Sequence, residues 1–366
     1  MNDIIKARNG KKINILIIGP NVTSNGGVSS VIQNYLSFDE WQNSELTFLP
    51  TFIDGSKVDK ILFFLKALLK LRKAIKTTCI DIAHIHIAER GSFFRKYVCA
   101  KLLKKHNKRI ILQHHGAEFN NFYLSMNTLI QRRISSLFKI VNLNIVLGKN
   151  LKEELLQISP EAKVSILHNA VTVYPKNPYN ADASIILFLG HLSERKGIYD
   201  LVKVIKRLDA ILDPKYTFAL CGEDVVNISS QINELGLSKR ICHLGWIGKE
   251  KKEAILADTV IHVLPSYNEC LPMAILETMS YGIPNISTSI ASIPEVILNG
   301  INGFLIEPGD TDSLYDKIIY MLNNTNERNK FSNNSYNLIN ENFSLPSNIQ
   351  ILESLYEQVY NGDEIW

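Results

Sequence analysis

Residues 269–286 read ECLPMAILETMSYGIPNI, which places two carboxylates eight positions apart around an apolar, helix-forming run. Pro272 stands just after the first carboxylate, and proline is tolerated in the first turn of a helix. The segment therefore predicts a loop that ends at Glu269 and a helix over Leu271–Tyr281. Because eight positions make a little over two helical turns, Glu269 and Glu277 can lie on one side of that helix.

This loop and helix can serve as a binding site. Unpaired N–H groups at a helix start attract anions, most often phosphate, and a nearby carboxylate can accept hydrogen bonds from sugar hydroxyls. A nucleotide diphosphate sugar needs both contacts. The simpler alternative is an amphipathic helix with a glutamate at each end. Gly282 and Pro284 favour a binding site, because with Pro272 they predict a loop, a helix and a loop that leads into a strand.

The same segment resembles the E-x7-E motif of the retaining glycosyltransferases of family 4, which have the GT-B fold. The match is close, except that Cys270 stands where the family usually has a glycine that lets the backbone approach the donor sugar. The resemblance implies that Glu277 accepts the ribose hydroxyls and Glu269 meets the sugar hydroxyls. It also implies that N–H groups around Pro272, in the stretch Leu271–Met273, bind the diphosphate.

A second phosphate-binding pattern lies in SIILFLGHLSERKGIYDLVKVI, a predicted strand, glycine loop and helix. A Lys-Gly pair before a helix can direct an ammonium and helix N–H groups at a diphosphate, although such turns are common. The segment resembles the family motif G-R-x-x-x-x-K-G, in which the Arg and Lys grip the diphosphate. Gly190, Lys196 and Gly197 fit the motif, while His191 replaces its Arg and Arg195 is expected to restore the lost charge.

The first half begins with a short apolar run, Ile13–Gly19, which predicts a buried parallel strand. Gly26 and Gly27 follow just before a helical pattern, and such a pair is often only a turn. The spacing is not G-x-G-x-x-G, so it indicates no dinucleotide fingerprint. Family members carry a similar Gly-Gly pair after their first strand, where it borders the donor phosphates and the acceptor.

Two histidines alternate in the predicted strand of DIAHIHIAERGSFFRK, so His84 and His86 face the same side. Histidines can bind a metal, but no third ligand is near in sequence, and we interpret them as core or cleft histidines. The segment also resembles family members that build bacterial surface polysaccharides, in which it borders the acceptor. That resemblance implies an acceptor side formed by Arg90, Ser92 and Arg95.

Another predicted strand, RIILQHHGAEF, ends in a polar cluster, and open α/β sheets bind ligands at the carboxyl ends of their strands. The family has a similar His-Gly pair here with its His directed at the donor sugar, which implies that role for His115. By the same resemblance, the backbone around Trp246 and Ile247 borders the nucleotide base.

Asp310 and Asp312 form a D-x-D pattern, the metal–diphosphate signature of the other main glycosyltransferase fold. The pattern follows a Pro-Gly pair and precedes a helical run. We therefore interpret Asp310 as a helix N-cap and expect no metal site.

The composition fits a globular protein, with 46% hydrophobic and 21% charged residues in a chain of 366, long enough for two domains. The five cysteines lack C-x-x-C spacing and are expected to be reduced thiols of a cytoplasmic protein. The first residues lack the apolar core of a signal peptide, and no apolar run approaches the ~18 residues of a membrane span.

Charge divides unevenly between the halves. Residues 1–175 hold 25 basic and 12 acidic residues, a formal charge of +13, whereas residues 176–366 hold 15 and 24, a charge of −9. The two basic runs, 57–76 and 95–109, indicate an anionic partner. The basic half shows no nucleic-acid-binding module, so we expect no nucleic acid and favour an anionic membrane surface.

The first basic run, KVDKILFFLKALLKLRKAIK, predicts an amphipathic helix. We expect a basic sector opposite the leucines that could lie on anionic lipid. Its members are Lys66, Lys70, Arg72, Lys73 and Lys76, and the leucines are Leu62, Leu65 and Leu69. The competing expectation is a surface helix whose leucines pack on the sheet while the lysines stay solvated.

We therefore expect an α/β protein of GT-B fold, with two Rossmann-like α/β/α domains that face each other across a cleft. Residues 1–175 would form the acceptor side, 176–345 the nucleotide-sugar domain, and 346–366 a helix that crosses back to the first domain. Pro175 and Pro178 mark the linker.

The implied reaction moves a hexose, with retention and without an obligatory metal or cofactor, from a UDP- or GDP-linked sugar to a lipid-linked or oligosaccharide acceptor in surface polysaccharide synthesis. His115, Glu269 and Lys196 are the implied catalytic residues. The enzyme is expected in the cytoplasm, peripheral on the inner face of the cytoplasmic membrane.

Three alternatives remain open. An epimerase of the same fold would need further acid and base carboxylates, and a glycogen-type phosphorylase would need a pyridoxal phosphate lysine in a much longer chain. A non-catalytic nucleotide-sugar-binding protein would have the same donor pocket, but it would not hydrolyse the donor.

Overall fold

The computed structural model describes residues 12–363, whose contacts separate two units. The first contains the residues up to Val146, Lys152–Leu167, and the chain from Ile349 onward. The second contains Leu147–Leu151 and His168–Asn348. The chain thus passes from one unit to the other after Leu167 and again after Asn348. The sequence analysis expected these boundaries at residues 175 and 345.

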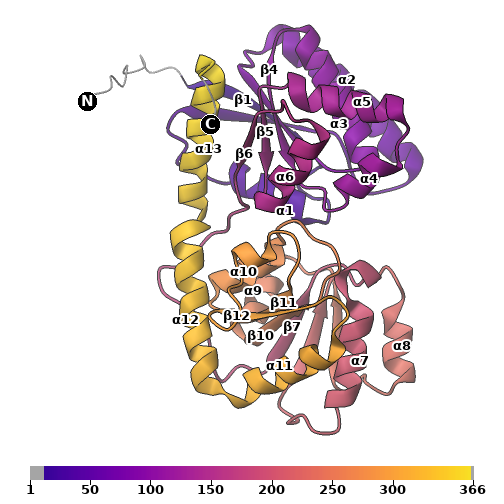
Figure 1. Ribbon diagram of the computed structural model, residues 1–366, viewed down its shortest axis with the longest axis vertical. Coiled ribbons are helices and arrows are strands. Elements are labelled where there is room, and N and C mark those ends of the chain that lie inside the picture. Colours follow the sequence, from indigo (N-terminus) through magenta and orange to yellow (C-terminus); the bar gives the residue numbers. More distant parts are fainter. Residues whose placement is uncertain (1–11, 364–366) are drawn as a thin grey trace. The chain divides into compact units, whose positions relative to one another are not determined.

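The first unit is built on a six-stranded parallel sheet in the order β2-β1-β3-β4-β5-β6 (Figure 1). The strands are β1 (Ile13–Gly19), β2 (Ser44–Pro50), β3 (Ile82–Ile87), β4 (Arg109–His114), β5 (Leu143–Val146) and β6 (Val164–Ile166). Its central strands, such as β3 and β5, are buried on both faces, as a parallel sheet covered by helices requires, whereas the edge strand β2 is partly exposed. The helices are α1 (Gly27–Leu36), α2 (Lys57–Thr77), α3 (Gly91–Lys105), α4 (Phe119–Ser125), α5 (Thr128–Ile140), and most of α6 (Lys149–Ile158) and α13 (Leu345–Asn361), whose first residues are grouped with the second unit.

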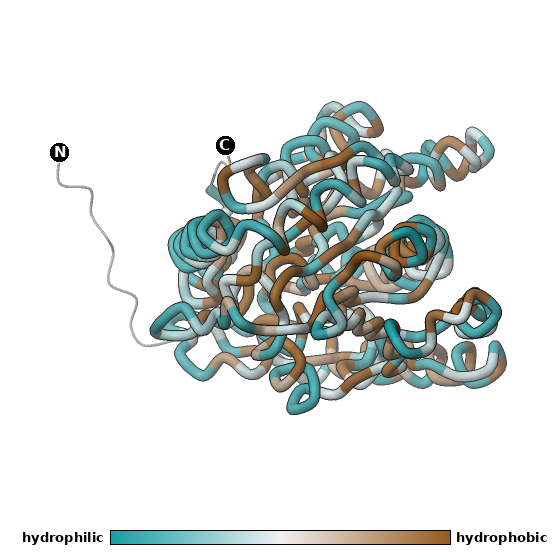
Figure 2. The backbone as a smooth tube through the Cα atoms, turned by 90° about the horizontal axis from the view of Figure 1, so that it is seen from below, coloured by the Kyte–Doolittle hydropathy of each residue, from teal (hydrophilic) through white to brown (hydrophobic). Residues whose placement is uncertain are grey.

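The second unit repeats this plan with the strand order β12-β11-β10-β7-β8-β9. Its strands are β7 (Ile185–Leu189), β8 (Thr217–Cys221), β9 (Ile241–Gly245), β10 (Thr259–Leu264), β11 (Asn285–Thr288) and β12 (Gly303–Ile306). Its helices are α7 (Ile198–Leu208), α8 (Ile228–Glu234), α9 (Lys249–Ala257), α10 (Met273–Ser280), α11 (Thr311–Asn323) and α12 (Thr325–Asn342), with 3-10 turns at Glu194–Lys196 and Ile293–Glu295. In Figure 2, hydrophobic and hydrophilic residues alternate along the helical turns, as expected of helices with one buried face.

In each sheet the order of successive strands reverses at one point, so that strands lie on one side of it earlier in the chain and on the other side later. In the first sheet it lies between β1 and β3, and in the second between β7 and β10. Loops diverge from the carboxyl ends of the two strands at such a switch point, and ligands of open α/β sheets bind in the space between them. The two switch points are therefore where a functional site is expected.

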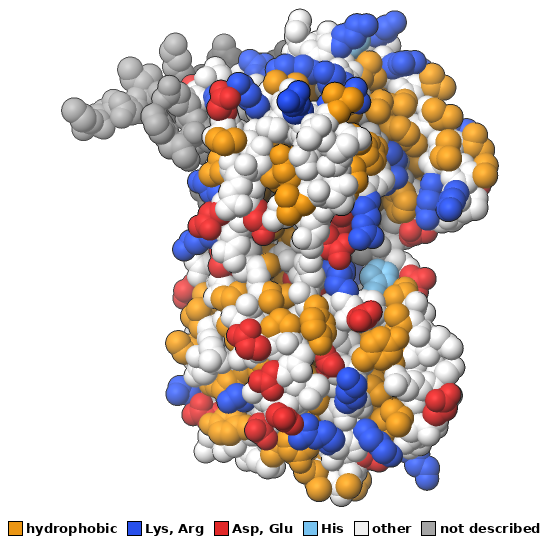
Figure 3. Space-filling model, turned by 45° about the vertical axis from the view of Figure 1, so that its right-hand side comes forward, with side chains coloured by type: hydrophobic (Ala, Val, Ile, Leu, Met, Phe, Trp, Pro, Cys, Tyr) orange, Lys and Arg blue, Asp and Glu red, His pale blue; other side chains and the backbone are white. Residues whose placement is uncertain are grey.

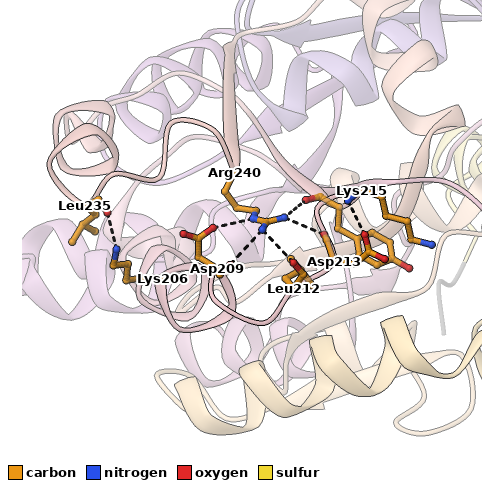
Figure 4. A network of polar contacts seen from close by, with 8 residues as sticks. Lys206, Asp209, Leu212, Asp213, Lys215, Leu235 and Arg240 are labelled. Atoms are coloured by element: carbon orange, nitrogen blue, oxygen red, sulfur yellow. Dashed lines mark hydrogen bonds and ion pairs between the residues drawn. The ribbon is translucent and has the colours of Figure 1, made fainter.

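Arg240 joins the turn after α7 to the start of β9 (Figure 4). Its Nε donates to Asp209 Oδ1 at 3.0 Å, and its Nη1 donates to the carbonyls of Asp213 and Tyr216 at 3.1 and 2.8 Å. Its Nη2 donates to the Leu212 carbonyl at 3.2 Å. One guanidinium thus satisfies several carbonyls that a turn would otherwise leave unpaired.

Helix α2 contradicts the prediction for the first basic run. Its buried face is formed by Ala67, Leu71 and Ile75, whereas Leu62, Leu65 and Leu69 are 51%, 52% and 63% exposed. The predicted opposition of lysines and leucines is wrong, because residues three or four positions apart share a helix face. Lys66 and Lys73 stand at this spacing from the leucines, so apolar and basic side chains form one exposed face.

Within residues 12–363, no helix is long and apolar enough to cross a bilayer. Cys99, Cys221 and Cys270 are buried thiols, and Cys79 and Cys242 are exposed ones.

Candidate active site

The second switch point brings together the two loops that carry the predicted donor-binding motifs. The loop after β7 contains Lys196, and the loop after β10 contains Glu269. Lys196 Nζ forms a buried ion pair with Glu269 Oε1, and Ser266 Oγ donates to the same oxygen at 2.9 Å. Arg195 ties the loops again, since its Nη1 donates to the Asn268 carbonyl at 2.9 Å. Two motifs far apart in sequence thus form one polar cluster.

Gly197 permits this close approach. Its φ of 73° lies in the left-handed region, which residues with a Cβ rarely adopt. A Cβ at this position would also lie 2.0 Å from the Pro265 carbonyl oxygen, too close for any side chain. The Lys-Gly pair therefore allows the start of α7 to pack directly against the loop after β10.

Helix α10 begins at Met273, two residues later than predicted, and ends at Ser280. Pro272 is its N-cap residue and has no side-chain cap hydrogen bond. The preceding carbonyl, that of Leu271, accepts a hydrogen bond from Asn169 Nδ2 at 3.0 Å. Cys270 is buried and does not have a positive φ, so its backbone conformation does not require the glycine that the family has there.

Glu277 does not share the lysine of Glu269. Its Oε1 accepts from Lys252 Nζ of α9 at 2.8 Å, in a pair that is largely buried. The sequence analysis missed Lys252, because α9 precedes the E-x7-E segment and lies in no recognised motif. Each carboxylate of that segment therefore has its own cation.

The side chain of Ile247 belongs to the hydrophobic core, where it packs in a cluster with Ile255, Leu256 and Tyr281. The buried side chain is not available to a ligand, and the prediction for this segment concerns its backbone. The neighbouring Trp246 is 49% exposed, and its ring centroid lies 5.9 Å from that of His191.

The D-x-D pattern is a helix start. Asp310 is the N-cap residue of α11, and its carboxylate accepts from Ser313 N at 2.9 Å and Ser313 Oγ at 2.7 Å. Asp312 pairs with Arg207 at 2.7 Å. The interpretation of Asp310 as an N-cap is confirmed.

The first switch point holds a pocket of about 280 Å³. It is lined from the loop after β1 and the start of α1 by Gly26 and Gly27, and from α3 by Ser92 and Arg95. Arg90 does not line it; this exposed side chain pairs with Glu118 at 2.7 Å. Of the three residues predicted for the acceptor side, Ser92 and Arg95 thus meet in one pocket and Arg90 does not.

The pocket is also lined by polar residues that the sequence analysis did not assign to the site, among them Lys96 and Ser24. Lys96 could have been found, because it stands four positions after Ser92 and so falls on the same face of α3. Ser24 has no comparable signal, since loop positions carry no periodicity.

The predicted catalytic His115 lies in the first unit beside this pocket. Its Nε2 is 2.9 Å from Nδ1 of His86, which lines the pocket, and the two rings stack with centroids 5.1 Å apart. Burial, helped by the neighbouring His84 and His114, lowers the pKa of His115 to about 3. We therefore expect a neutral imidazole at pH 7, which offers one N–H donor and one acceptor nitrogen.

His84 is buried in the core, with Nδ1 2.7 Å from the Tyr356 hydroxyl of α13. His86 is buried as well, and the two rings stack with centroids 4.7 Å apart. Their interpretation as core or cleft histidines is confirmed. Among the residues with described positions, no group of three or more His, Cys, Asp or Glu side chains is arranged to hold a metal ion.

Comparison with known proteins agrees with this architecture. A family model described as "Glycosyltransferase Family 4" matches residues 44–173, and one described as "Glycosyl transferases group 1" matches residues 173–338. The chain is similar to the structure of Anabaena Alr3699/HepE in complex with UDP, with a TM-score of 0.72 and 17% identity over 94% of this chain and 100% of that one.

Two curated relatives are enzymes of sugar transfer. The chain is 24% identical to the Bacillus anthracis N-acetyl-alpha-D-glucosaminyl L-malate synthase, over 81% of this chain and 79% of the relative. It is 24% identical to the Escherichia coli UDP-Gal:alpha-D-GlcNAc-diphosphoundecaprenol alpha-1,3-galactosyltransferase, over 84% and 82%. With two parallel sheets, a polar cluster at a switch point and both family models matched, this chain belongs to the family 4 glycosyltransferases of GT-B fold.

Proposed function

We propose that this glycosyltransferase moves a hexose, with retention, from a UDP- or GDP-linked donor to a lipid-linked or oligosaccharide acceptor in surface polysaccharide synthesis. The observation that carries the proposal is the buried pair of Lys196 and Glu269 at the switch point of the second sheet. The E. coli relative, whose name gives a UDP-sugar donor and a diphosphoundecaprenol-linked acceptor, supports both substrate classes.

In this proposal Lys196 is the cation that meets the leaving diphosphate. An ammonium held in a buried site stabilises developing negative charge more strongly than it would in water, and it needs little reorganisation. Glu269 holds the ammonium in place while the site has no donor, and it accepts hydrogen bonds from the sugar hydroxyls when the donor binds. Arg195 adds a second cation, four positions after the His191 that replaces the family's Arg.

Glu277 and Lys252 have a second role, which is to bind the ribose. Lys252 holds the Glu277 carboxylate by a 2.8 Å ion pair, so this acceptor of hydroxyl hydrogen bonds has a defined position. Backbone N–H groups at the start of α10 complete the diphosphate site, because a helix N-terminus favours negative charge.

A same-face displacement fits the site better than a covalent intermediate. Glu269 Oε1 is occupied by Lys196 and Ser266, which disfavours Glu269 as a nucleophile. The leaving phosphate then helps to take the acceptor proton, and the anomeric configuration is retained. Proton NMR of the first product formed tests the retained configuration, which an inverted anomer would contradict.

We also propose that the enzyme attaches reversibly to the cytoplasmic face of an anionic membrane through the exposed face of α2. Val58, Leu62, Leu65 and Leu69 supply apolar area, and Lys66 and Lys73 stand among the leucines. Figure 3 shows hydrophobic side chains gathered beside Lys and Arg on the first unit. Leucine side chains that enter the headgroup region and lysines that meet anionic lipids act together at such a surface.

The donor class is tested by thermal unfolding with a panel of UDP- and GDP-sugars. A ligand at 100 times its dissociation constant stabilises the folded state by ~2.7 kcal/mol, which is readily measured. One nucleotide should protect selectively, also in the presence of EDTA, because Asp310 is a helix cap. If no nucleotide sugar protects, or if protection and turnover require Mn²⁺, the proposed donor site is wrong.

A further inference from the structure

We propose that the pocket at the first switch point binds an anionic group, a phosphate or a carboxylate, of the glycosyl acceptor. The inference rests on the proposed function, because it takes the pocket's occupant to be the acceptor. It adds Lys96 as the residue that recognises the charge, together with Arg95.

The charged side chains described at the pocket are all of one sign, positive. Of the described residues that line it, Lys96 and Arg95 are cationic, and none is Asp or Glu. Within residues 12–363, neither cation forms an ion pair. A pocket with two unneutralised cations is complementary to an anion.

Lys96 is the central residue of this pocket, because its cationic side chain is almost fully buried, at 1% exposure. Its Nζ donates to Thr51 Oγ1 at 2.7 Å, and that hydroxyl donates in turn to the Gly19 carbonyl at 2.9 Å. Burying a lysine without a counter-ion costs folding free energy, and burial lowers the pKa of Lys96 to about 7. A bound anion would remove that penalty by neutralising the ammonium.

Other polar atoms at the pocket also lack partners. The buried Nε of Arg95, the Oγ of Ser24 and the Nε2 of His86 have no hydrogen-bond partner, although Ser24 and His86 are only 7% and 1% exposed. Buried polar groups are rarely left unpaired unless a ligand or water completes them. The Arg95 guanidinium also lies 4.8 Å from the ring centroid of Phe52, a cation–π contact that does not neutralise its charge.

The backbone around the pocket suits the same ligand. Helix α1 starts here with Gly26 as its N-cap and no side-chain cap hydrogen bond, so its first N–H groups add positive potential. A Cβ on Gly26 would meet no atom within 4 Å, which shows that space is open at this point. An oxyanion can therefore be held by side chains from α3 and by N–H groups of α1.

The acceptor is the better source of the anion than the donor. The second unit has its own cations for the donor diphosphate, Lys196 and Arg195. The Lys96 pocket is built entirely from the first unit, at a separate switch point. If the anion belongs to the donor, replacing Lys96 should weaken nucleotide binding, and if it belongs to the acceptor, nucleotide binding should be unchanged.

Inorganic phosphate serves as the probe, titrated into the full chain at pH 7 and low ionic strength, with sodium chloride at matched ionic strength as the blank. Phosphate should raise the Tm of the wild type saturably. Lys96→Met should weaken phosphate binding at least about tenfold, while its Tm without phosphate should equal or exceed that of the wild type because a buried charge is removed. Lys101→Met, an exposed change on the same helix, should bind phosphate normally. A parallel titration with acetate distinguishes a carboxylate preference from a phosphate preference.

A second arm measures the affinity of each protein for UDP and GDP. Lys96→Met should bind the nucleotide as tightly as the wild type. An equal loss of nucleotide affinity would assign the pocket to the donor and overturn the acceptor assignment. Unsaturable phosphate effects, or equal phosphate binding by Lys96→Met, would overturn the anion site. Phosphate binding without any nucleotide binding would contradict the proposed function while the anion site stands.

Discussion

Lys96 and Lys196 are both largely shielded from solvent, for different reasons. Lys196 is paired with Glu269, so its charge is neutralised in the site. Lys96 is buried without an ion-pair partner among the described residues, and its hydrogen bond to Thr51 does not neutralise it. A buried charge that folding does not require is a common mark of a functional site. Replacing Lys96 and replacing Lys196 should therefore have different effects.

The stability gained by Lys96→Met should depend on pH. In the folded protein the pKa of Lys96 is lowered to about 7, against an ordinary value near 10.4 in an unfolded chain. Between these values the unfolded state binds more protons, so wild-type stability rises with pH. After burial, the neighbouring charge of Arg95 also lowers the pKa of Lys96 and Cys99 acts in the opposite direction, and both residues are retained in the variant.

We therefore expect the stability advantage of Lys96→Met to be largest below pH 7 and to shrink toward pH 10. Urea unfolding across that range, with Lys101→Met as the control, measures it. An advantage that grows with pH would contradict the assigned cause, which is the cost of burying the charged ammonium.

At the scale of the element, Arg240 anchors the turn that follows α7. Arg240→Met keeps the aliphatic stem but removes the hydrogen bonds to Asp209 and to the turn carbonyls (Figure 4). Hydrogen bonds that involve a charged group contribute about 1.5–3 kcal/mol each, so we expect a loss of about 2–3 kcal/mol in the free energy of unfolding, because water replaces part of the lost bonding. Chemical denaturation measures the loss, with the exposed neighbour Lys239→Met as the control. A change below about 0.5 kcal/mol would show that the turn holds without Arg240.

The exposed face of α2 predicts membrane binding that depends on charge. Wild type should sediment with anionic vesicles and not with neutral ones, and less so at high salt, since the Debye length is ~8 Å at physiological ionic strength. The triple variant Lys66→Glu, Lys70→Glu, Lys73→Glu should remain in solution. Its matched control changes three exposed lysines of the second unit, Lys239, Lys249 and Lys251, to Glu and should still sediment. If both variants sediment equally, α2 is not the docking surface.

Parts of this account could be predicted from the sequence because they depend on local rules. Apolar runs bounded by glycine predicted β1, and the Pro-Gly pair before a helical run predicted the Asp310 cap. The Lys-Gly pair at 196–197 and the E-x7-E segment predicted two loops that would share a site, and these loops meet in the structure.

Other features could not be predicted because they depend on which face a helix buries and which elements become neighbours. The prediction of which face α2 buries is wrong, because its small buried face (Ala67, Leu71, Ile75) gives a weaker hydrophobic pattern in the sequence than the exposed leucines. The pairing of Glu277 with Lys252 requires α9 to pack beside α10. The lack of an ion-pair partner at Lys96 is likewise a property of the folded chain, and no sequence motif marks it.

At the scale of the whole molecule, the same plan is used twice. Each unit has a six-stranded parallel sheet and a polar site where the order of its strands reverses. The second unit carries the paired residues assigned to the donor, and the first carries the unpaired cations assigned to the acceptor. The proposed division of labour agrees with the concentration of basic residues in the first half of the chain and of acidic ones in the second.

The rate of nucleoside diphosphate release from the protecting nucleotide sugar tests the central claim most directly, because it needs no known acceptor. Wild type should release it slowly and without added metal. Lys196→Met and Glu277→Ala should each lower the rate at least ~100-fold, since each removes a charge-assisted contact to the diphosphate or the ribose. Lys101→Met should leave the rate unchanged, and circular dichroism should show all variants folded. Near wild-type release by both Lys196→Met and Glu277→Ala would contradict the assignment of the active site to the second switch point.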